Sequence, residues 1–266
     1  MNCKICFGQQ KKLISFYKAQ KKENLFGLEN NKKYKRTIYK CYKCGHFTNQ
    51  HKFSFYLNKI YKNTYAKSSH GNIKKKFNSI NNISKDKSSN YFRCKFINNL
   101  KFLKKKKRSL LDIGAGLGIF AYSMKKLGWK INAIEINSEL NKFISKNLKI
   151  HTVGKNIIEK KFNKKSKYDL VTLNKVLEHF SYANSLKILK KIKNILTIDG
   201  FVYIEVPDGQ SASKSGLFRQ EFYFEHYNIF SKKSLKLYLE NLNFRILRIQ
   251  KIKEVTGKYT LRAVAR

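Results

Sequence analysis

The segment that most limits the possible folds lies near the middle of the chain, at residues 110–120, with the sequence LLDIGAGLGIF. A short apolar run leads into three glycines, Gly114, Gly116 and Gly118, and a helix-like stretch follows. A glycine-rich turn between a strand and a helix lets a ligand approach bare backbone N–H groups. A phosphate-binding P-loop is excluded because no Gly-Lys-Ser/Thr follows. The segment therefore predicts an α/β fold with a ligand site after this strand.

Strand-like and helix-like patterns alternate from residue 109 to the end of the chain. Strands are expected at residues 110–113, 130–136, 150–153, 168–173, 200–206, 244–252 and 259–265, with helices between them. Such alternation is typical of a mostly parallel sheet with helices on both faces, and seven strands make it Rossmann-like. Glu135 ends the second strand, where a carboxylate can bind the two hydroxyls of a ribose.

Four of the five cysteines form two Cys-x-x-Cys pairs, Cys3 with Cys6 and Cys41 with Cys44. Each pair can bind one metal ion through two thiolates, and two pairs complete a tetrahedral zinc site. Disulfides or a redox pair are the alternatives. The absence of an apolar signal region behind Met1 favours a reducing, cytoplasmic location and hence structural zinc.

The cysteine spacing and the composition divide the chain into three predicted segments. Residues 1–52 are expected to form a zinc-ribbon module, residues 53–107 a polar helical connector, and residues 108–266 the α/β domain. No apolar stretch is long enough for a membrane span, so no membrane insertion is expected. The oligomeric state stays open.

The formal net charge of +42 raises the possibility of a nucleic-acid partner. Only 8 of the 58 basic residues are Arg, although Arg is the residue suited to bidentate phosphate and base contacts. Lys, Asn and Ile together make up 102 of the 266 residues, and all three have A/T-rich codons. Genome composition therefore explains the charge without a nucleic-acid partner.

Taken together, residues 112–118, 168–179 and 196–208 resemble class I S-adenosylmethionine-dependent methyltransferases. The first motif of that family is similar to residues 112–118, its acidic ribose ligand to Glu135, and its later motifs to residues 168–179 and 196–208. The resemblance implies S-adenosylmethionine as methyl donor, with Asp112 and the glycine loop 114–118 at its amino-acid end. It also implies an adenine contact near Asn156 and a contact of Asn174 with the methionine part.

A narrower resemblance lies at residues 225–235, EHYNIFSKKSL. This segment is similar to the E-H-x-x-x-F-S-x-x-S-L segment of a bacterial methyltransferase subgroup that carries an N-terminal cysteine-rich zinc module. Members of that subgroup are linked to sugar or cell-surface polysaccharide biosynthesis. The resemblance implies a small polar acceptor, in particular a sugar or a polysaccharide precursor.

Two histidines follow strands that end at the same edge of the predicted sheet. His179 comes after the fourth strand and His226 after the fifth, with Glu178 and Glu225 beside them. Either imidazole could act as the base near neutral pH, although a histidine that only bonds a backbone carbonyl is the alternative. Related methyltransferases hold a divalent metal with Glu-x-x-Glu-His, but Lys175 replaces the first Glu here, so no catalytic metal is expected.

Two other functions remain open at this point. An RNA methyltransferase could use the zinc ribbon and the lysines to hold phosphates. A non-catalytic scaffold could keep the fold without the reaction, but the intact glycine loop and Glu135 favour an enzyme.

Overall fold

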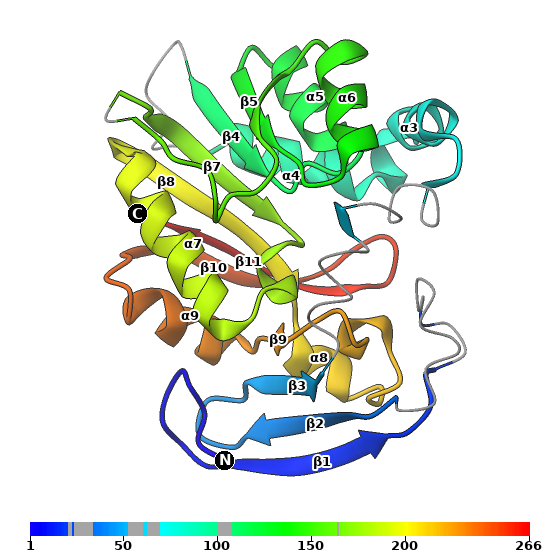
Figure 1. The fold of residues 1–266 in the computed structure, drawn as a ribbon, viewed down its shortest axis with the longest axis vertical. Helices are drawn as coiled ribbons and strands as arrows, with labels where there is room; N and C mark the ends of the chain where they lie inside the picture. The colour runs from blue at the N-terminus through cyan, green and yellow to red at the C-terminus, as the bar shows by residue number, and fades with distance from the viewer. Residues whose placement is uncertain (21–22, 24–33, 53–60, 63–69, 101–107, 164) are drawn as a thin grey trace. The chain divides into compact units, whose positions relative to one another are not determined.

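A computed structural model describes residues 1–20, 23, 34–52, 61–62, 70–100, 108–163 and 165–266 (Figure 1). The chain forms two compact units. Unit 1 contains Met1–Asn58, Asn174–Lys193 and Tyr203–Arg266, and unit 2 contains Lys59–Leu173 and Asn194–Val202. Within the described ranges, no helix has the length and apolar character needed to cross a membrane. The boundaries at residues 52 and 107 remain predictions.

The predicted seven-stranded sheet is confirmed, with the order β10-β11-β8-β7-β4-β5-β6. The strands are β4 (Ser109–Ile113), β5 (Lys130–Ile134), β6 (His151–Gly154), β7 (Tyr168–Asn174), β8 (Leu196–Pro207), β10 (Ile246–Lys253) and β11 (Tyr259–Ala265). β4 pairs in parallel with β5 and β7, and β5 with β6, whereas β10 and β11 are antiparallel. The apolar run 110–113 is almost completely buried, because a parallel strand is covered on both faces.

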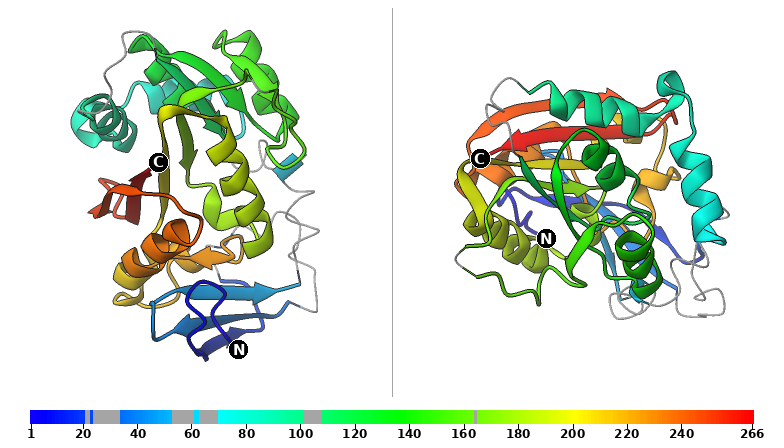
Figure 2. Two further views of the ribbon diagram at one scale, coloured as in Figure 1. Left: turned by 90° about the vertical axis from the view of Figure 1, so that its left-hand side faces the viewer. Right: turned by 90° about the horizontal axis from the view of Figure 1, so that it is seen from above.

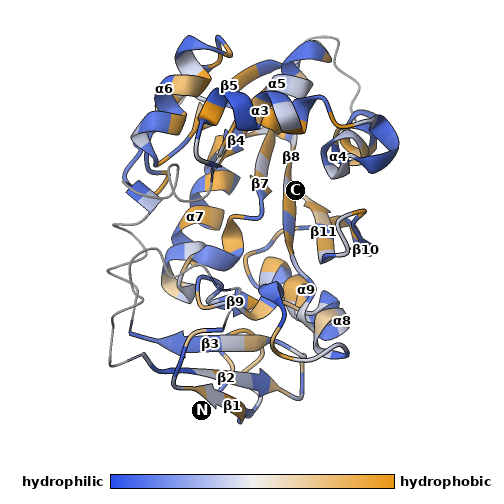
Figure 3. Cartoon of the chain, turned by 90° about the vertical axis from the view of Figure 1, so that its right-hand side faces the viewer, coloured by the Kyte–Doolittle hydropathy of each residue, from blue (hydrophilic) through white to orange (hydrophobic). Residues whose placement is uncertain are grey.

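Helices connect the strands of the sheet. Their bounds are α5 (Ile119–Lys126), α6 (Ser138–Lys146), α7 (Tyr182–Ile195), α8 (Gly209–Ser213) and α9 (Lys232–Glu240). The N-cap of α9 is Ser231, whose hydroxyl accepts from the Ser234 N–H in a capping box. In Figure 3 helix α7 shows both hydrophobic and hydrophilic residues along its length, as expected of a helix that covers a sheet.

Two helices of unit 2 come from the predicted connector, namely α3 (Ile73–Asn81) and α4 (Ser89–Asn98). The Phe77 ring contacts Tyr122 of α5 and Phe143 of α6, both at a centroid distance of 5.4 Å. Residues 53–60, 63–69 and 101–107 of the connector lie outside the described residues. The described part is therefore helical, as predicted, and packs on α5 and α6.

The N-terminal module, residues 1–52, contributes three strands to a second sheet in unit 1. These are β1 (Gln10–Phe16), β2 (Arg36–Cys41) and β3 (Phe47–His51), all antiparallel to their neighbours. The fourth strand is β9 (Asn228–Ile229), which pairs with β3 through Phe47↔Ile229 and Thr48↔Asn228. In Figure 2, left, β9 lies in the orange part of the chain beside the blue strands. The pairing of β9 with β3 was not predicted from the sequence.

Candidate functional site

The glycine loop has backbone geometry that only glycine adopts readily. Gly114, Gly116 and Gly118 have φ angles of 70°, 56° and 73°. A Cβ on Gly118 would lie 2.6 Å from Leu148 Cδ1, so this glycine permits close packing at the start of α5. A Cβ on Gly116 would meet none of the described atoms within 4 Å. The middle of the loop therefore leaves space for a ligand to approach, which fits the predicted cofactor contact.

Glu135 follows β5 directly and lies at the same sheet edge as the glycine loop. Its Oε2 accepts from the Gly116 N–H at 2.7 Å, and its Oε1 accepts from the Asn137 N–H at 2.8 Å. Burial raises the pKa of Glu135 to about 7, against the lowering effect of the two backbone N–H groups. The carboxylate thus sits beside the open loop, where its remaining lone pairs can accept from two ribose hydroxyls.

The other predicted cofactor residues have individual environments. Asp112 is buried in β4 and accepts from the Thr172 hydroxyl at 2.6 Å. Asn156 bonds within its own turn, to Glu159 Oε1 at 2.8 Å and from the Ile158 N–H at 2.9 Å. Asn174 is the last residue of β7. The roles of these three residues toward a cofactor remain predictions.

The two Cys-x-x-Cys pairs converge as predicted. The Sγ atoms of Cys3 and Cys44 lie 3.7 Å apart, and those of Cys6 and Cys41 lie 3.4 Å apart. All four sulfur atoms lie within 4.8 Å of one another. Tetrahedral zinc with bonds of about 2.3 Å requires sulfurs about 3.8 Å apart, whereas a disulfide requires about 2.05 Å. The geometry therefore fits a shared metal and excludes disulfides in this arrangement.

The second Cys-x-x-Cys turn, residues 41–44, is joined to the start of α9 in the same unit. Gly45 has a φ of +73°, and a Cβ there would lie 3.1 Å from Ser231 Cβ. The Ser231 hydroxyl, which caps α9, also donates to the Cys44 carbonyl at 2.6 Å. The Asn241 amide at the end of α9 donates to the Ile5 carbonyl at 2.8 Å. Both Cys-x-x-Cys turns are therefore held to α9 by hydrogen bonds.

The structure brings the two predicted histidines together within unit 1. Their ring centroids lie 4.8 Å apart. His179 Nδ1 lies 3.1 Å from the Glu225 carbonyl oxygen, and His226 Nδ1 lies 3.1 Å from the Glu221 carbonyl oxygen. The Tyr227 N–H donates to the Glu178 carbonyl at 2.8 Å. The segments that carry the histidines are thus tied to each other by backbone contacts.

Burial, more than charge, sets the protonation of this pair. It lowers the pKa of His179 to about 4 and holds the pKa of His226 well below 6.5. Both imidazoles are therefore neutral at neutral pH. The sequence predicted a base tuned near neutral pH, and the lower values follow from the loss of solvent around the rings.

Glu178 is a feature of this cluster whose environment the sequence did not reveal. It is completely buried, and within the described part of the chain neither carboxyl oxygen has a hydrogen-bond partner. Burial raises its pKa to about 8, although Lys175 acts in the opposite direction. Ligand atoms of Glu178, His179 and His226 lie within 4.8 Å of one another. This cluster is polar but carries little charge at neutral pH.

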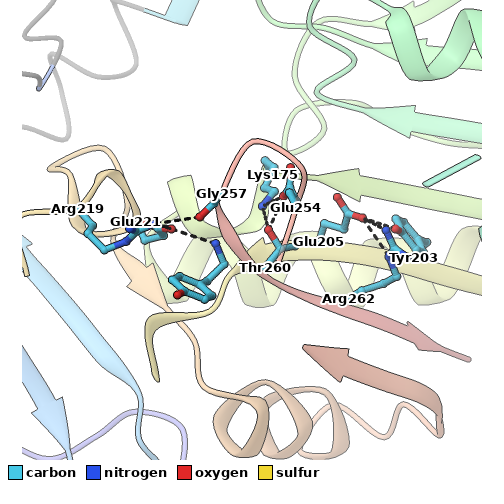
Figure 4. Close-up of polar contacts among 10 residues, drawn as sticks. Lys175, Tyr203, Glu205, Arg219, Glu221, Glu254, Gly257, Thr260 and Arg262 are labelled. Carbon is cyan, nitrogen blue, oxygen red and sulfur yellow. Dashed lines mark hydrogen bonds and ion pairs between the residues drawn. The ribbon is translucent and has the colours of Figure 1, made fainter. Parts of the chain in front are cut away.

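Lys175 adopts strained backbone where β7 ends. Its φ is +59°, uncommon for a residue other than glycine or asparagine. Its ammonium lies 2.8 Å from Glu254 Oε1 and also contacts the Thr260 hydroxyl (Figure 4). Backbone strain of this kind is often found at functional sites. In the sequence, Lys175 stood out only because it replaces the first Glu of the Glu-x-x-Glu-His metal motif.

Three arginines of unit 1 are also held by carboxylates. Arg262 lies 3.0 Å from Glu205, Arg219 lies 2.8 Å from Glu221, and Arg36 lies 3.5 Å from Glu23. The first two pairs are visible in Figure 4, where Arg219 also donates to the Gly257 carbonyl. Arg36 and Glu23 are completely buried at their side chains. These guanidinium groups are therefore committed to intramolecular partners.

The comparisons with known proteins assign the family. The sequence model of the family described as methyltransferase domain matches residues 87–249, so the chain belongs to this family. The protein is an S-adenosylmethionine-dependent methyltransferase, as the resemblance of residues 112–118, 168–179 and 196–208 implied. The alternative of a non-catalytic scaffold is therefore wrong. No protein with a curated description matches the sequence significantly.

Solved structures share the fold at low identity. A Burkholderia thailandensis 1,6-didemethyltoxoflavin-N1-methyltransferase with bound substrate and S-adenosylhomocysteine is 15% identical, with a TM-score of 0.57, covering 87% of this chain and 95% of that one. An Archaeoglobus fulgidus S-adenosylmethionine-dependent methyltransferase is 21% identical, with a TM-score of 0.53, covering 67% and 94%. The Synechocystis magnesium protoporphyrin IX methyltransferase is 11% identical, with a TM-score of 0.53, covering 68% and 84%. These likenesses confirm the fold.

Proposed function

We propose that the enzyme transfers the methyl group of S-adenosylmethionine to a small polar acceptor, a sugar or a cell-surface polysaccharide precursor. The observation that carries this proposal is the pairing of cations in the unit that holds the histidine pair. Lys175, Arg219 and Arg262 each lie within 3.0 Å of a carboxylate oxygen. Paired cations are poor ligands for a phosphate backbone, whereas neutral imidazoles suit a hydroxyl. The toxoflavin-precursor enzyme, with a small molecule bound, supports the same size of acceptor.

The residues that would hold the cofactor are those of the glycine loop and its neighbours. S-adenosylmethionine supplies a methyl group already activated on a sulfonium. The glycine loop 114–118, which leaves space beside Gly116, and the Glu135 carboxylate are proposed to bind and orient it, with Asp112 at its amino-acid end. Gly118, Asn156 and Asn174 complete the proposed contacts. The protein has only to align the acceptor and remove one proton.

That proton is assigned to the histidine pair. The Nδ1 of His226 faces the Glu221 carbonyl, so a neutral ring carries its hydrogen there and keeps a lone pair on Nε2. His179 is held by the Glu225 carbonyl and also by a hydrogen bond with the Lys175 backbone. We assign His226 as the first candidate base and His179 as the second, for an acceptor that loses a proton.

The four-cysteine cluster is proposed to bind one structural zinc ion. The supporting observations are the sulfur separations of 3.4 and 3.7 Å and the all-thiolate donor set. A site of four zinc-bound thiolates fits a reducing compartment, so the cytoplasm is the proposed location. The proposed organisation is a zinc module at 1–52, a connector at 53–107 and the methyltransferase domain at 108–266.

The acceptor class can be tested with S-adenosylmethionine carrying a tritiated methyl group. The purified enzyme is incubated separately with a mixture of nucleotide sugars and with total RNA, at salt concentrations from about 50 to 200 mM. We expect the label in the sugar fraction, with a rate that changes little with salt. Label in the RNA, with affinity falling about a thousandfold or more over this range, would contradict the proposal.

A further inference from the structure

We propose that the N-terminal module positions the turn 222–227, which carries Glu225 and His226, and that Asn49 is the residue through which it acts. The assignment of His226 as a base belongs to the proposed function above. The positioning itself does not depend on that assignment, because it concerns only the geometry of the turn.

Asn49 lies in the middle of β3 and contacts three backbone carbonyls of the turn. Its amide Nδ2 donates to the Tyr223 carbonyl at 3.0 Å and to the Phe222 carbonyl at 3.3 Å. Its backbone N–H donates to the Tyr227 carbonyl at 3.1 Å. Asn49 is only 1% exposed. One residue of the module therefore holds both ends of the turn.

The neighbours of Asn49 on the same face of β3 contact the same turn. Alternate residues of a strand share a face, so Phe47, Asn49 and His51 point to one side. The Phe47 ring lies 5.3 Å from the Phe222 ring, and His51 Nε2 lies 2.6 Å from the Phe224 carbonyl oxygen. Each of the three side chains on this face of β3 therefore contacts a residue of the turn 222–227.

A buried ion pair from the same module holds the middle of the turn. The Arg36 guanidinium donates to the Phe222 carbonyl at 2.8 Å, and the Phe224 N–H donates to Glu23 Oε1 at 2.5 Å. Arg36 and Glu23 lie 3.5 Å apart. A buried ion pair rarely adds much net stability, but it fixes the geometry of what it touches.

The connection from Asn49 to His226 passes through one carbonyl group. The Tyr223 carbonyl oxygen accepts from the Asn49 amide and also from the His226 N–H, both at 3.0 Å. The His226 ring is then fixed by its Nδ1 contact with the Glu221 carbonyl. Glu221 is itself held by Arg219 and by the Tyr259 N–H at 3.1 Å. If Asn49 is removed, the turn loses the donor that faces this carbonyl.

The test reads the tautomer of His226 in the full-length, zinc-loaded protein labelled with ¹⁵N-histidine. Asn49→Leu removes the side-chain amide that donates to the Phe222 and Tyr223 carbonyls, keeps a similar volume, and leaves the backbone N–H that donates to Tyr227 in place. The matched control is Asn241→Leu, since Asn241 also donates its amide to a carbonyl, that of Ile5, but does not contact the turn. The His226 signals are assigned by their absence in His226→Gln. The measurement needs no acceptor, so it is independent of the proposed function.

In the wild type and in Asn241→Leu, we expect His226 as a single tautomer protonated at Nδ1. In Asn49→Leu, its Nδ1 and Nε2 resonances should move toward each other, as a mixture of tautomers forms, while one zinc ion per chain is retained. If Asn49→Leu does not fold, Asn49→Ala is measured in its place. A His226 signal identical to wild type in the folded variant would overturn the proposal.

Discussion

Replacing Cys41 with Ser is expected to release the zinc ion and to disorder the N-terminal module. Cys41 is completely buried, and its sulfur lies 3.4 Å from that of Cys6. Structural zinc contributes about 10–16 kcal/mol of apparent binding free energy in small zinc-finger peptides, and the loss of one thiolate removes most of it. Mass spectrometry under native conditions should show one zinc ion per wild-type chain and none per variant chain.

The loss should extend beyond the module itself. Because β3 pairs with β9 and holds the turn 222–227, hydrogen exchange at the backbone N–H groups of both segments should become faster in Cys41→Ser. The control is Cys94→Ser, since Cys94 lies in α4 and outside the four-cysteine cluster. A metal-free wild type with a protected N-terminal sheet would contradict the zinc assignment. A second metal ion in the wild type would contradict the prediction drawn from Lys175.

Replacing His226 with Ala is expected to lower kcat about a hundredfold or more while the affinity for S-adenosylmethionine is unchanged. The expected loss reflects the missing proton acceptor. Since the pKa of His226 lies well below 6.5, the wild-type rate should not fall between about pH 8 and pH 6 through protonation of this ring. Rates with the identified acceptor and calorimetry with the cofactor measure the two effects separately.

The matched control for that prediction is His151→Ala. His151 is the first residue of β6 and is exposed, so its removal should leave kcat unchanged. If His226→Ala and His179→Ala both keep full activity, the base assignment is wrong. Attention would then move to Tyr182 and Tyr223, or to an acceptor that needs no base.

The sheet could be predicted from the sequence because its signals are local. The apolar run before Gly114 and the carboxylate Glu135 after the next strand each lie within a few residues of the feature they define. The convergence of Cys3 and Cys44 could be predicted because metal chemistry requires it.

The features that escaped prediction depend on contacts between distant residues. β9 has only two residues, so no pattern of hydropathy marks it, and its pairing with β3 spans about 180 residues. The low pKa of His226 and the high pKa of Glu178 arise from burial that only the tertiary structure provides. The sequence signal that could have pointed to the contact with the turn 222–227 was Asn49, a polar residue on the same strand face as Phe47 and His51.

The measurement that tests the cofactor site most directly is a calorimetric titration of S-adenosylmethionine into wild type and Glu135→Ala. Because Glu135 is buried beside the Gly116 N–H, its loss should weaken binding by about 1.5–3 kcal/mol, which is roughly a tenfold to hundredfold rise in Kd. Glu240→Ala removes an exposed carboxylate at the end of α9, outside the proposed cofactor contacts, and should bind as tightly as wild type. Equal affinity in wild type and Glu135→Ala would contradict the assignment of the glycine loop and Glu135 as the cofactor site.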